Sequence, residues 1–263
     1  MRSSKIVFHN CIYNDMFEER TYRNQVYGKQ LQASFRVVVK ETDLFIRAGD
    51  NLKDIARESV LRHRRFLENY MREHAGFAEM LTPWEVRGPS PGIVRAMAYA
   101  GQQAGVGPMA AVAGAIAESV GHDLLVRTGE VMVENGGDLF IKSNKPVTIG
   151  IFANTSPLSL RIGLRLDTGR QPMAVCTSSG TVGHSLSMGK ADAVCTVSAS
   201  CPLADAAATS IGNHVQTAGD IKQAIEIGKK IKGVEGIIII IKDKIGMWGD
   251  LEIVPLQEKK VEF

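Results

Sequence analysis

The segment GIIIII at residues 236–241 constrains the fold more than any other part of this sequence. It places five isoleucines in a row, and successive side chains of a β-strand point to opposite faces of a sheet. A run of β-branched apolar residues of this length is typical of a strand that is covered on both faces. We therefore expect residues 236–241 to form a fully buried strand.

Six further strands are predicted in the middle of the chain. In LSLRIGLRL, residues 158–166, leucine or isoleucine alternates with polar or small residues, as in a half-buried antiparallel strand. Two β-rich runs within 33–49, and a return of the chain through 242–256, add strands at the two ends. The six ranges are 130–133, 138–142, 147–153, 158–166, 173–177 and 193–199.

Helices are expected on both sides of this strand-rich block. Their signals are a 3.6-residue apolar period after Asp50, the Ser90–Pro91 pair, a small-residue segment that ends at Gly121, and the segments 200–213 and 219–233. Clustered strands with helices at either end favour an α+β fold, mostly antiparallel sheet with packed helices, over a doubly wound parallel sheet. No linker-like composition divides the chain, so we expect one domain over residues 1–263, with 1–32 as a peripheral N-terminal segment.

Two parts of the sequence echo each other. VVVKETDLFIRAG at 37–49 and VMVENGGDLFIKSN at 131–144 each combine a strand, a turn and the letters Asp-Leu-Phe-Ile before a basic residue. Both lie near a predicted helix. A chance match of two amphipathic hairpins gives this pattern, and so does an internal duplication of a hairpin-plus-helix unit, which we include in the fold prediction.

Composition excludes several classes of function. The formal net charge of +3 comes from 31 basic and 28 acidic residues, which gives no electrostatic case for a nucleic-acid partner. No apolar run approaches the roughly 20 residues of a membrane span, and the N-terminus lacks the apolar run of a signal peptide. Cys11, Cys176, Cys195 and Cys201 form no CxxC pair, which favours reduced, buried thiols. We expect a cytoplasmic protein without a membrane partner.

The segment SCPLADAAATSIGN, residues 200–213, predicts a helix with unusual side chains. Pro202 fits its first turn. Asp205 and Thr209 are four residues apart, so they project from one face, among alanines that leave space beside them. A carboxylate near a helix N-terminus is favourable by itself, and a threonine can bond back to the carbonyl of the preceding turn. The alternative is a Mg²⁺ site shared with a phosphate substrate, because Mg²⁺ takes oxygen ligands of these kinds.

The segment ENGGDLFI at 134–141 allows two interpretations. Gly136 and Gly137 between two strands are typical of a hairpin turn, which needs no function. Alternatively, the two glycines let a ligand approach the backbone while a neighbouring polar side chain, such as that of Asp138, orients it.

The segment CTSSGTVGHSLSMGKAD at 176–192 predicts a long loop rich in glycine and hydroxyl groups. Such a loop offers N–H and hydroxyl donors to phosphate oxygens, although a plain surface loop is also consistent with it. A Walker A motif is excluded, since Ala191 follows Lys190 where serine or threonine is needed. Ser179 lies in TSSGT and not in GxSxG, so a nucleophilic triad has no support. The glycine-rich start of the helix at 107–118 is a further candidate anion site, and small-residue packing explains it equally well.

Taken in order, these motifs resemble the ApbE-like superfamily, whose best-known members are Mg²⁺-dependent FAD:protein FMN transferases. The order is the small-residue helix 107–118, then ENGGDLF, the TSSG loop with its histidine, and ADAAAT. The sequence is most similar to a smaller archaeal and bacterial family of that superfamily, through AGVGPMAAVAGAIAE, VENGGD, CTSSGTVGHS and LADAAAT. The resemblance covers nearly all of residues 35–255 and implies an ApbE-like fold.

The resemblance also implies site residues. In the transferases an aspartate and a threonine of the ADAxxT-like helix bind Mg²⁺, which correspond to Asp205 and Thr209 here. A main-chain carbonyl of the earlier alanine-glycine helix completes the protein ligands, and it falls near Ala110. The implied cofactor-binding residues, for FAD or a related phosphorylated ligand, are Gly136, Gly137, Asp138, Thr177, Ser178, Ser179, Gly180 and His184.

The sequence departs from the transferases at two elements. HSLSMGK keeps only His184 and Gly189 of their His-x-x-Asp-Pro-Arg-Thr-Gly element, and GVGPMAA lacks the lysine of their corresponding helix. No catalytic residue is therefore identified. The sequence points to a Mg²⁺-dependent protein that binds a phosphate, nucleotide or flavin-nucleotide ligand, with FMN transfer to a protein acceptor, or a related phosphotransfer, as its activity. The alternative is a non-catalytic flavin- or metabolite-binding accessory protein, in the anaerobic sulfur or homocysteine metabolism to which the smaller family has been linked. Homo-oligomerisation stays open.

Overall fold

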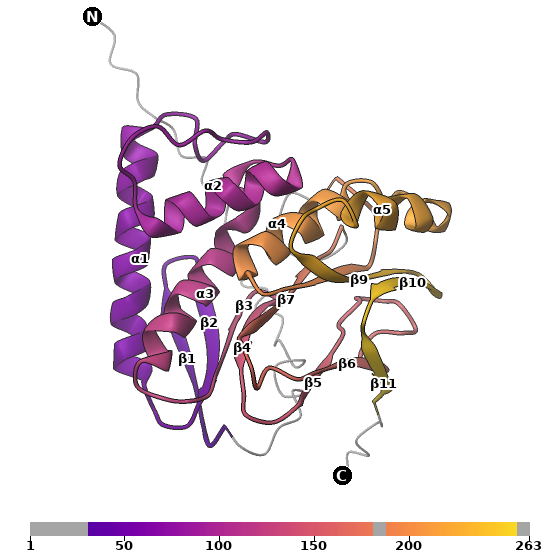
Figure 1. The fold of residues 1–263 in the computed structure, drawn as a ribbon, viewed down its shortest axis with the longest axis horizontal. Coiled ribbons are helices and arrows are strands. Elements are labelled where there is room, and N and C mark those ends of the chain that lie inside the picture. The colour runs from indigo at the N-terminus through magenta and orange to yellow at the C-terminus, as the bar shows by residue number, and fades with distance from the viewer. Residues whose placement is uncertain (1–30, 181–187, 257–263) are drawn as a thin grey trace, which may run out of the picture.

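The isoleucine run lies in the middle layer of a three-layer structure. The computed structural model describes residues 31–180 and 188–256. Ile237 and Ile239 of strand β9 (Val234–Ile241) pack into a core shared with the helices, whereas Ile238 and Ile240 pack into a second core on the opposite face. The second core is closed by a small sheet (Figure 1). The strand is thus buried on both faces, as the sequence predicts.

Two antiparallel sheets form the strand layers. All strand pairs in both sheets are antiparallel, which confirms the α+β prediction. The large sheet has the order β1 (Ala33–Val39), β2 (Thr42–Ala48), β3 (Val131–Asn135), β4 (Asp138–Lys142), β7 (Met173–Ser178), β8 (Ala193–Ser198), β9 and β10 (Lys244–Gly249). The small sheet has the order β11 (Glu252–Pro255), β6 (Ile162–Leu166) and β5 (Val147–Gly150).

The helices cover the other face of the large sheet (Figure 1). The segment expected to end at Gly121 continues to Leu125, because Gly121 lies directly against the ring of Phe140 and packs without breaking the helix. The elements are α1 (Lys53–Glu73), α2 (Gly92–Ala104), the 3₁₀ turn η2 (Pro108–Ala111), α3 (Val112–Leu125), α4 (Cys201–Gly212), the 3₁₀ turn η3 (Ala218–Asp220) and α5 (Ile221–Gly228).

Residues 158–161 do not continue strand β6. Leu160 has a φ of 55°, and its N–H donates to the carbonyl of Ile151 at 2.7 Å. Arg161 donates to the carbonyl of Leu158, which closes a turn. The alternation of leucines therefore spans a turn as well as a strand, because both place apolar side chains against the same small core.

The two hairpins that echo each other in sequence lie side by side, since β2 pairs with β3. Their Asp-Leu-Phe-Ile letters face opposite ways. Leu44 and Ile46 pack on the helix side of the sheet, whereas Leu139 and Ile141 pack on the side of the small sheet. The Asp-Leu-Phe-Ile segment begins one residue farther from its turn in the first hairpin than in the second. A shift of one residue along a strand moves every side chain to the opposite face of the sheet. The duplication of a hairpin-plus-helix unit thus stays a prediction.

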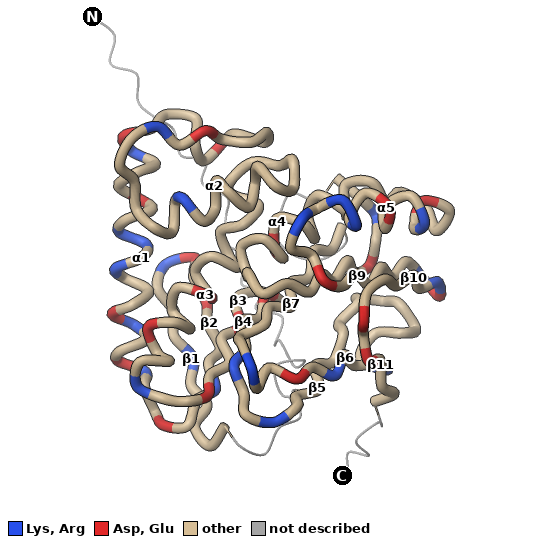
Figure 2. The backbone as a smooth tube through the Cα atoms, viewed as in Figure 1, with Lys and Arg blue, Asp and Glu red and all other residues tan. Residues whose placement is uncertain are grey.

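Charged side chains of both signs lie along α1 and α5 and in the connecting loops (Figure 2). In the part of the chain that the structure describes, no single helix is long and apolar enough to cross a membrane. Only α2 together with Pro108–Leu125 has the length and composition, and these two parts are bent by 106° at the break.

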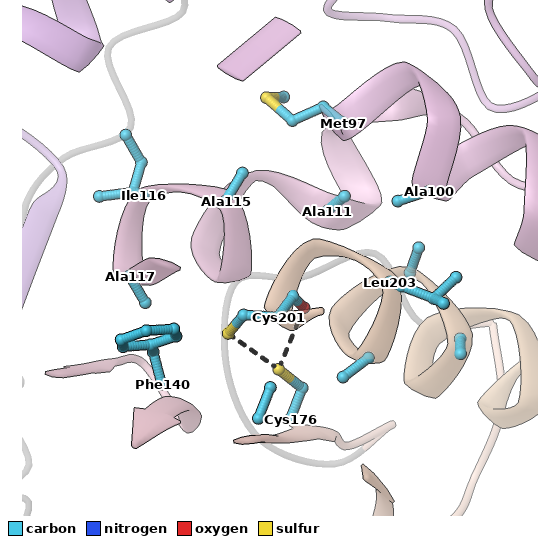
Figure 3. Packing of buried hydrophobic residues seen from close by; sticks show 14 of the residues in the cluster. Met97, Ala100, Ala111, Ala115, Ile116, Ala117, Phe140, Cys176, Cys201 and Leu203 are labelled. Carbon is cyan, nitrogen blue, oxygen red and sulfur yellow. Dashed lines mark hydrogen bonds between the residues drawn. The ribbon is translucent and has the colours of Figure 1, made fainter. Parts of the chain in front are cut away.

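Small residues allow η2, α3 and α4 to pack closely. Ala111 of η2 and Ala115 and Ala117 of α3 lie in the core that the helices share with the large sheet, and Ala117 points toward the ring of Phe140 (Figure 3). At Gly114 the two helix backbones touch: an added Cβ would lie 2.5 Å from the carbonyl oxygen of Cys201, closer than real Cβ contacts. Gly114 therefore serves as clearance for a second backbone.

We expect Gly114→Ala to lower the stability of the protein by about 1–3 kcal/mol, because the added methyl group must displace a backbone carbonyl. Thermal unfolding followed by circular dichroism measures the change. Gly129→Ala is the matched control, since an added Cβ there meets no atom within 4 Å. Equal melting temperatures for both variants would contradict the close packing at Gly114.

Candidate functional site

Asp205 lies where the first turn of α3 meets α4. Its Oδ2 accepts a hydrogen bond from the N–H of Gly114 at 2.9 Å, and the N–H of Ala113 also donates to this carboxylate. These two N–H groups belong to the first turn of α3, where no helical carbonyl is available to accept from them. Asp205 thus stabilises the N-terminus of a neighbouring helix.

Glu118 of α3 does the same for α4. Its Oε2 accepts from the N–H of Cys201, the first residue of α4, at 2.6 Å. Burial raises the pKa of Glu118, although this hydrogen bond and the nearby His122 both act to lower it. Each helix therefore supplies a carboxylate to the N-terminus of the other.

Asp138 is a second buried carboxylate at this place. It begins β4, on the same face of the large sheet as Phe140, which packs among the helices. It accepts hydrogen bonds from the thiol of Cys176 and the N–H of Thr177. Burial raises its pKa to about 7, against these two hydrogen bonds and with a smaller contribution from the charge of Glu134.

The carboxylates of Asp138 and Asp205 act on each other. Burial and then the charge of Asp138 raise the pKa of Asp205 well above its usual range. Asp138 is buried and Asp205 is partly exposed, and two neighbouring carboxylates that repel each other are stabilised either by a proton on one of them or by a cation. The structure thus brings together one residue that the sequence assigned to a metal and one that it assigned to a cofactor.

The oxygen groups here suit a hard cation. Thr209 follows Asp205 by one turn of α4 and is partly exposed, and Ala110 lies in η2, which packs against α4. Among residues 31–180 and 188–256, no group of three or more His, Cys, Asp and Glu side chains is arranged to hold a metal ion. A Mg²⁺ site would therefore combine a carboxylate with hydroxyl, carbonyl and ligand oxygens, which Mg²⁺ accepts.

Gly136 and Gly137 form the two-residue turn between β3 and β4. Their φ values of 67° and 111° lie in the region that favours glycine, and the N–H of Gly137 donates to Oε1 of Glu134 at 3.1 Å. The hairpin interpretation accounts for both glycines. Their contribution to the site is to place Asp138 at the start of β4.

The hydroxyl-rich segment divides between the two faces of the sheet. Oγ1 of Thr177 contacts Sγ of Cys195 at 3.2 Å, in the core of the small sheet, so only its backbone N–H reaches the site. Ser178 alternates with Thr177 and therefore points toward the helices. Its Oγ is buried and has no hydrogen-bond partner among residues 31–180 and 188–256, which makes it a polar atom that needs a ligand here.

The rest of this loop is described only at its ends. Ser179 follows β7, and the N–H of Gly180 donates to the carbonyl of Ala191 at 3.0 Å. The N–H of Met188 donates to Oδ1 of Asn213, at the C-terminal end of α4. His184 lies outside the described residues. The loop ends are thus anchored to α4, the helix that carries Asp205.

The glycine-rich start of the small-residue helix is not an open anion site. The N–H of Ala110 donates to the carbonyl of Gly107, and that of Val112 donates to Met109. The next two N–H groups are bound to Asp205. The anion at this helix N-terminus is a carboxylate of the protein itself.

The described cysteines are free and buried, as expected. Sγ of Cys176 lies 3.6 Å from Sγ of Cys201, beneath the small residues of α3 and α4 (Figure 3). Burial raises the pKa of Cys176 well above its usual range, and it raises those of Cys195 and Cys201 to about 11. Such thiols are unreactive as nucleophiles.

Sequence reasoning missed two residues that position the site. Glu118 and Gly114 lie in the small-residue helix. The one sequence feature that could have pointed to them is a charged glutamate among alanines. Asn135 of β3 also positions this region, because its Nδ2 donates to the carbonyl of Ala113 at 3.0 Å and fixes the start of α3.

Comparison with known proteins identifies the family. The family model described as "AbpE bacteria" matches residues 23–251. The UPF0280 protein of Methanocaldococcus jannaschii is 38% identical over 232 residues, which are 86% of this chain and 94% of that protein. The UPF0280 protein of Methanosarcina acetivorans is 37% identical over 232 residues, 86% of this chain and 90% of that protein. This chain belongs to the UPF0280 family.

Solved structures show that this UPF0280 protein has the ApbE fold. The flavin transferase ApbE from Vibrio cholerae matches with a TM-score of 0.51 and 11% identity, over 82% of this chain and 96% of that chain. The flavinyl transferase ApbE of Pseudomonas stutzeri matches with a TM-score of 0.53 and 12% identity, over 82% of this chain and 93% of that chain. The ApbE protein of Thermotoga maritima matches with a TM-score of 0.52 and 15% identity, over 81% of this chain and 96% of that chain. The predicted ApbE-like fold is confirmed.

In the absence of metal, we expect Asp138→Asn to change how the stability of the protein depends on pH. The pKa of Asp138 is about 7 in the folded state and about 3.9 in an unfolded chain. The folded state thus binds more protons between these values, so wild-type stability falls as pH rises from about 4 to 7. The free energy of unfolding of the variant does not fall in this way. At pH 8 the variant should therefore be more stable relative to wild type than at pH 5, on the order of a few kcal/mol. Urea unfolding at pH 5 and pH 8 with EDTA measures the change, and equal differences at the two values would contradict it.

We further expect the thiols of Cys176, Cys195 and Cys201 to resist alkylation in the folded protein, because all three are buried and protonated at neutral pH. Peptide mass spectrometry after iodoacetamide treatment, with and without denaturant, reads each site. Rapid labelling of any of the three without denaturant would show that the core is more open than described.

Proposed function

We propose that this UPF0280 protein binds Mg²⁺ together with a phosphorylated ligand, a flavin nucleotide such as FAD being the candidate, at the α3–α4 crossing of its ApbE-like fold. The observation that carries the proposal is the pair of repelling carboxylates, Asp205 and Asp138, at the α3–α4 crossing. Without a bound cation, protonation of one of the two carboxyl groups would relieve the repulsion. The fold shared with flavin transferases supports the flavin part of the proposal.

The chain contributes rigid placement of the oxygens. Glu118 holds the start of α4, and the N–H groups of Ala113 and Gly114 orient the carboxylate of Asp205. Thr209 on the same helix face adds a hydroxyl, and a carbonyl near Ala110 completes the protein ligands. A bound Mg²⁺ would supply charge neutralisation for phosphate oxygens.

The ligand's phosphates are assigned to the end of β7. In the part of the chain that the structure describes, Oγ of Ser178 is buried there without a hydrogen-bond partner, and in the sequence the segment Thr177–Gly180 precedes His184. Asp138 fixes the backbone of Thr177 because its carboxylate accepts a hydrogen bond from the N–H of Thr177. The hydroxyl of Ser178 can then donate to a phosphate oxygen.

FMN transfer to a protein acceptor, or a related phosphotransfer, is the activity that this arrangement would serve. The non-catalytic alternative, a flavin or metabolite carrier for another enzyme, is favoured by the missing Asp-Pro-Arg of the loop after His184. The distinction is whether the bound pyrophosphate is cleaved. Binding of Mg²⁺ and ligand is common to both.

We expect calorimetric titration of the protein with FAD to show binding that needs Mg²⁺. Asp205→Asn should weaken this binding by about tenfold or more, since it removes a charged oxygen ligand. Asp243→Asn, on the exposed turn before β10, makes the same change in net charge and should leave the binding unchanged. Binding that is equal with EDTA, or equal in both variants, would refute the metal site.

A second measurement separates the two activities. The protein is incubated with FAD, Mg²⁺ and a peptide carrying a threonine acceptor, and AMP release is followed by chromatography. AMP release that the Asp205→Asn variant lacks supports transfer. Tight FAD binding with no AMP release supports the carrier.

A further inference from the structure

Strand β10 forms an open edge of the large sheet. Within residues 31–180 and 188–256 it pairs only with β9, and it lies at the end of the sheet farthest from α1 (Figure 1). Ile245 and Met247 expose 40% and 47% of their surface. An edge strand with apolar side chains and unpaired backbone groups is a template for another strand.

The hairpin register shows which backbone groups are free. A two-residue turn joins Ile241 to Lys244, so these two form a hydrogen-bonded pair. Every second residue from Lys244 therefore bonds to β9. The N–H and C=O groups of Ile245, Met247 and Gly249 point away from β9, out of the sheet.

We propose that a second copy of this chain pairs with β10 in antiparallel register centred on Met247, which joins the two large sheets into one. This register places Met247 opposite its copy, and Ile245 opposite Gly249. Among the possible antiparallel registers, this one pairs each of Ile245, Met247 and Gly249 with an outward-pointing residue of the second copy. The strand is therefore complementary to itself.

Side-chain chemistry agrees with this register. Residues directly opposite each other in an antiparallel pair lie on one face. Lys244 of each copy comes opposite the end of the other β10, which Asp250 follows, so two pairs of opposite charge flank the centre. The exposed side chains of Met247 from both copies meet on the other face, next to those of Ile245.

The opposite edge of the sheet lacks this complementarity. By the same argument from the Lys40–Glu41 turn, the outward residues of β1 are Ser34, Arg36 and Val38. Self-pairing there would centre on Arg36, whose guanidinium is bound to Asp43 of β2, and would bring two guanidinium groups together. Like charges directly opposite are unfavourable, so the second copy is assigned to β10.

Sedimentation velocity over a concentration series up to roughly 100 µM tests the proposal. We expect a species of twice the 28.6 kDa chain mass. Met247→Pro should give a monomer that melts at the temperature of the wild type under dilute, monomeric conditions, because the N–H that it removes is not used within the chain. Val38→Pro, at an outward position of β1, is the matched control and should keep the dimer.

Charge exchange tests the register. Lys244→Asp and Asp250→Lys should each weaken dimerisation by about tenfold, since each creates two like-charge contacts, and the double variant should restore it. A wild-type monomer throughout the series, or a dimer that survives Met247→Pro, would overturn the proposal. Single exchanges without effect, or a double variant that is not restored, would overturn this register.

Discussion

The candidate site depends on the contact between α3 and α4 at Gly114. Because position 114 has no side chain, the two backbones touch, and each helix N-terminus comes within reach of a carboxylate on the other. Helix N-termini carry unsatisfied N–H groups and partial positive charge. Asp205 and Glu118 satisfy these groups mutually, which fixes how the two helices cross and therefore where the carboxylate of Asp205 is held.

This arrangement has an electrostatic consequence. The sheet beneath the crossing places Asp138 at the start of β4, so a second carboxylate is buried beside the first. Hydrogen bonds from backbone N–H groups stabilise each charge, yet burial outweighs them and both pKa values rise. Retaining two such groups is physically reasonable when a cation completes the site, which is the reason we connect the helix crossing to Mg²⁺.

Local patterns identified the elements well where one face or both faces of a strand are covered. The five isoleucines and the 138–142 strand were predicted as they are found. The pattern failed at residues 158–161, because a turn with a positive φ at Leu160 also places Leu158 against the small core. The pattern was also misleading at the two hairpins. Their identical Asp-Leu-Phe-Ile segments begin at different distances from the turn, so the same residue types pack into opposite cores.

The sequence by itself determined the α+β class, the ApbE-like resemblance and the oxygen-bearing residues Asp205, Asp138 and Thr209, because these follow from periodicity and short motifs. Only the tertiary structure decided what those residues contact. Asp205 bonds to the start of another helix 91 residues earlier in the chain, and Thr177 turns its hydroxyl away from the site. Such contacts depend on which backbones approach each other, and that is set by small residues whose local signal is the same in a plain core and in a binding site.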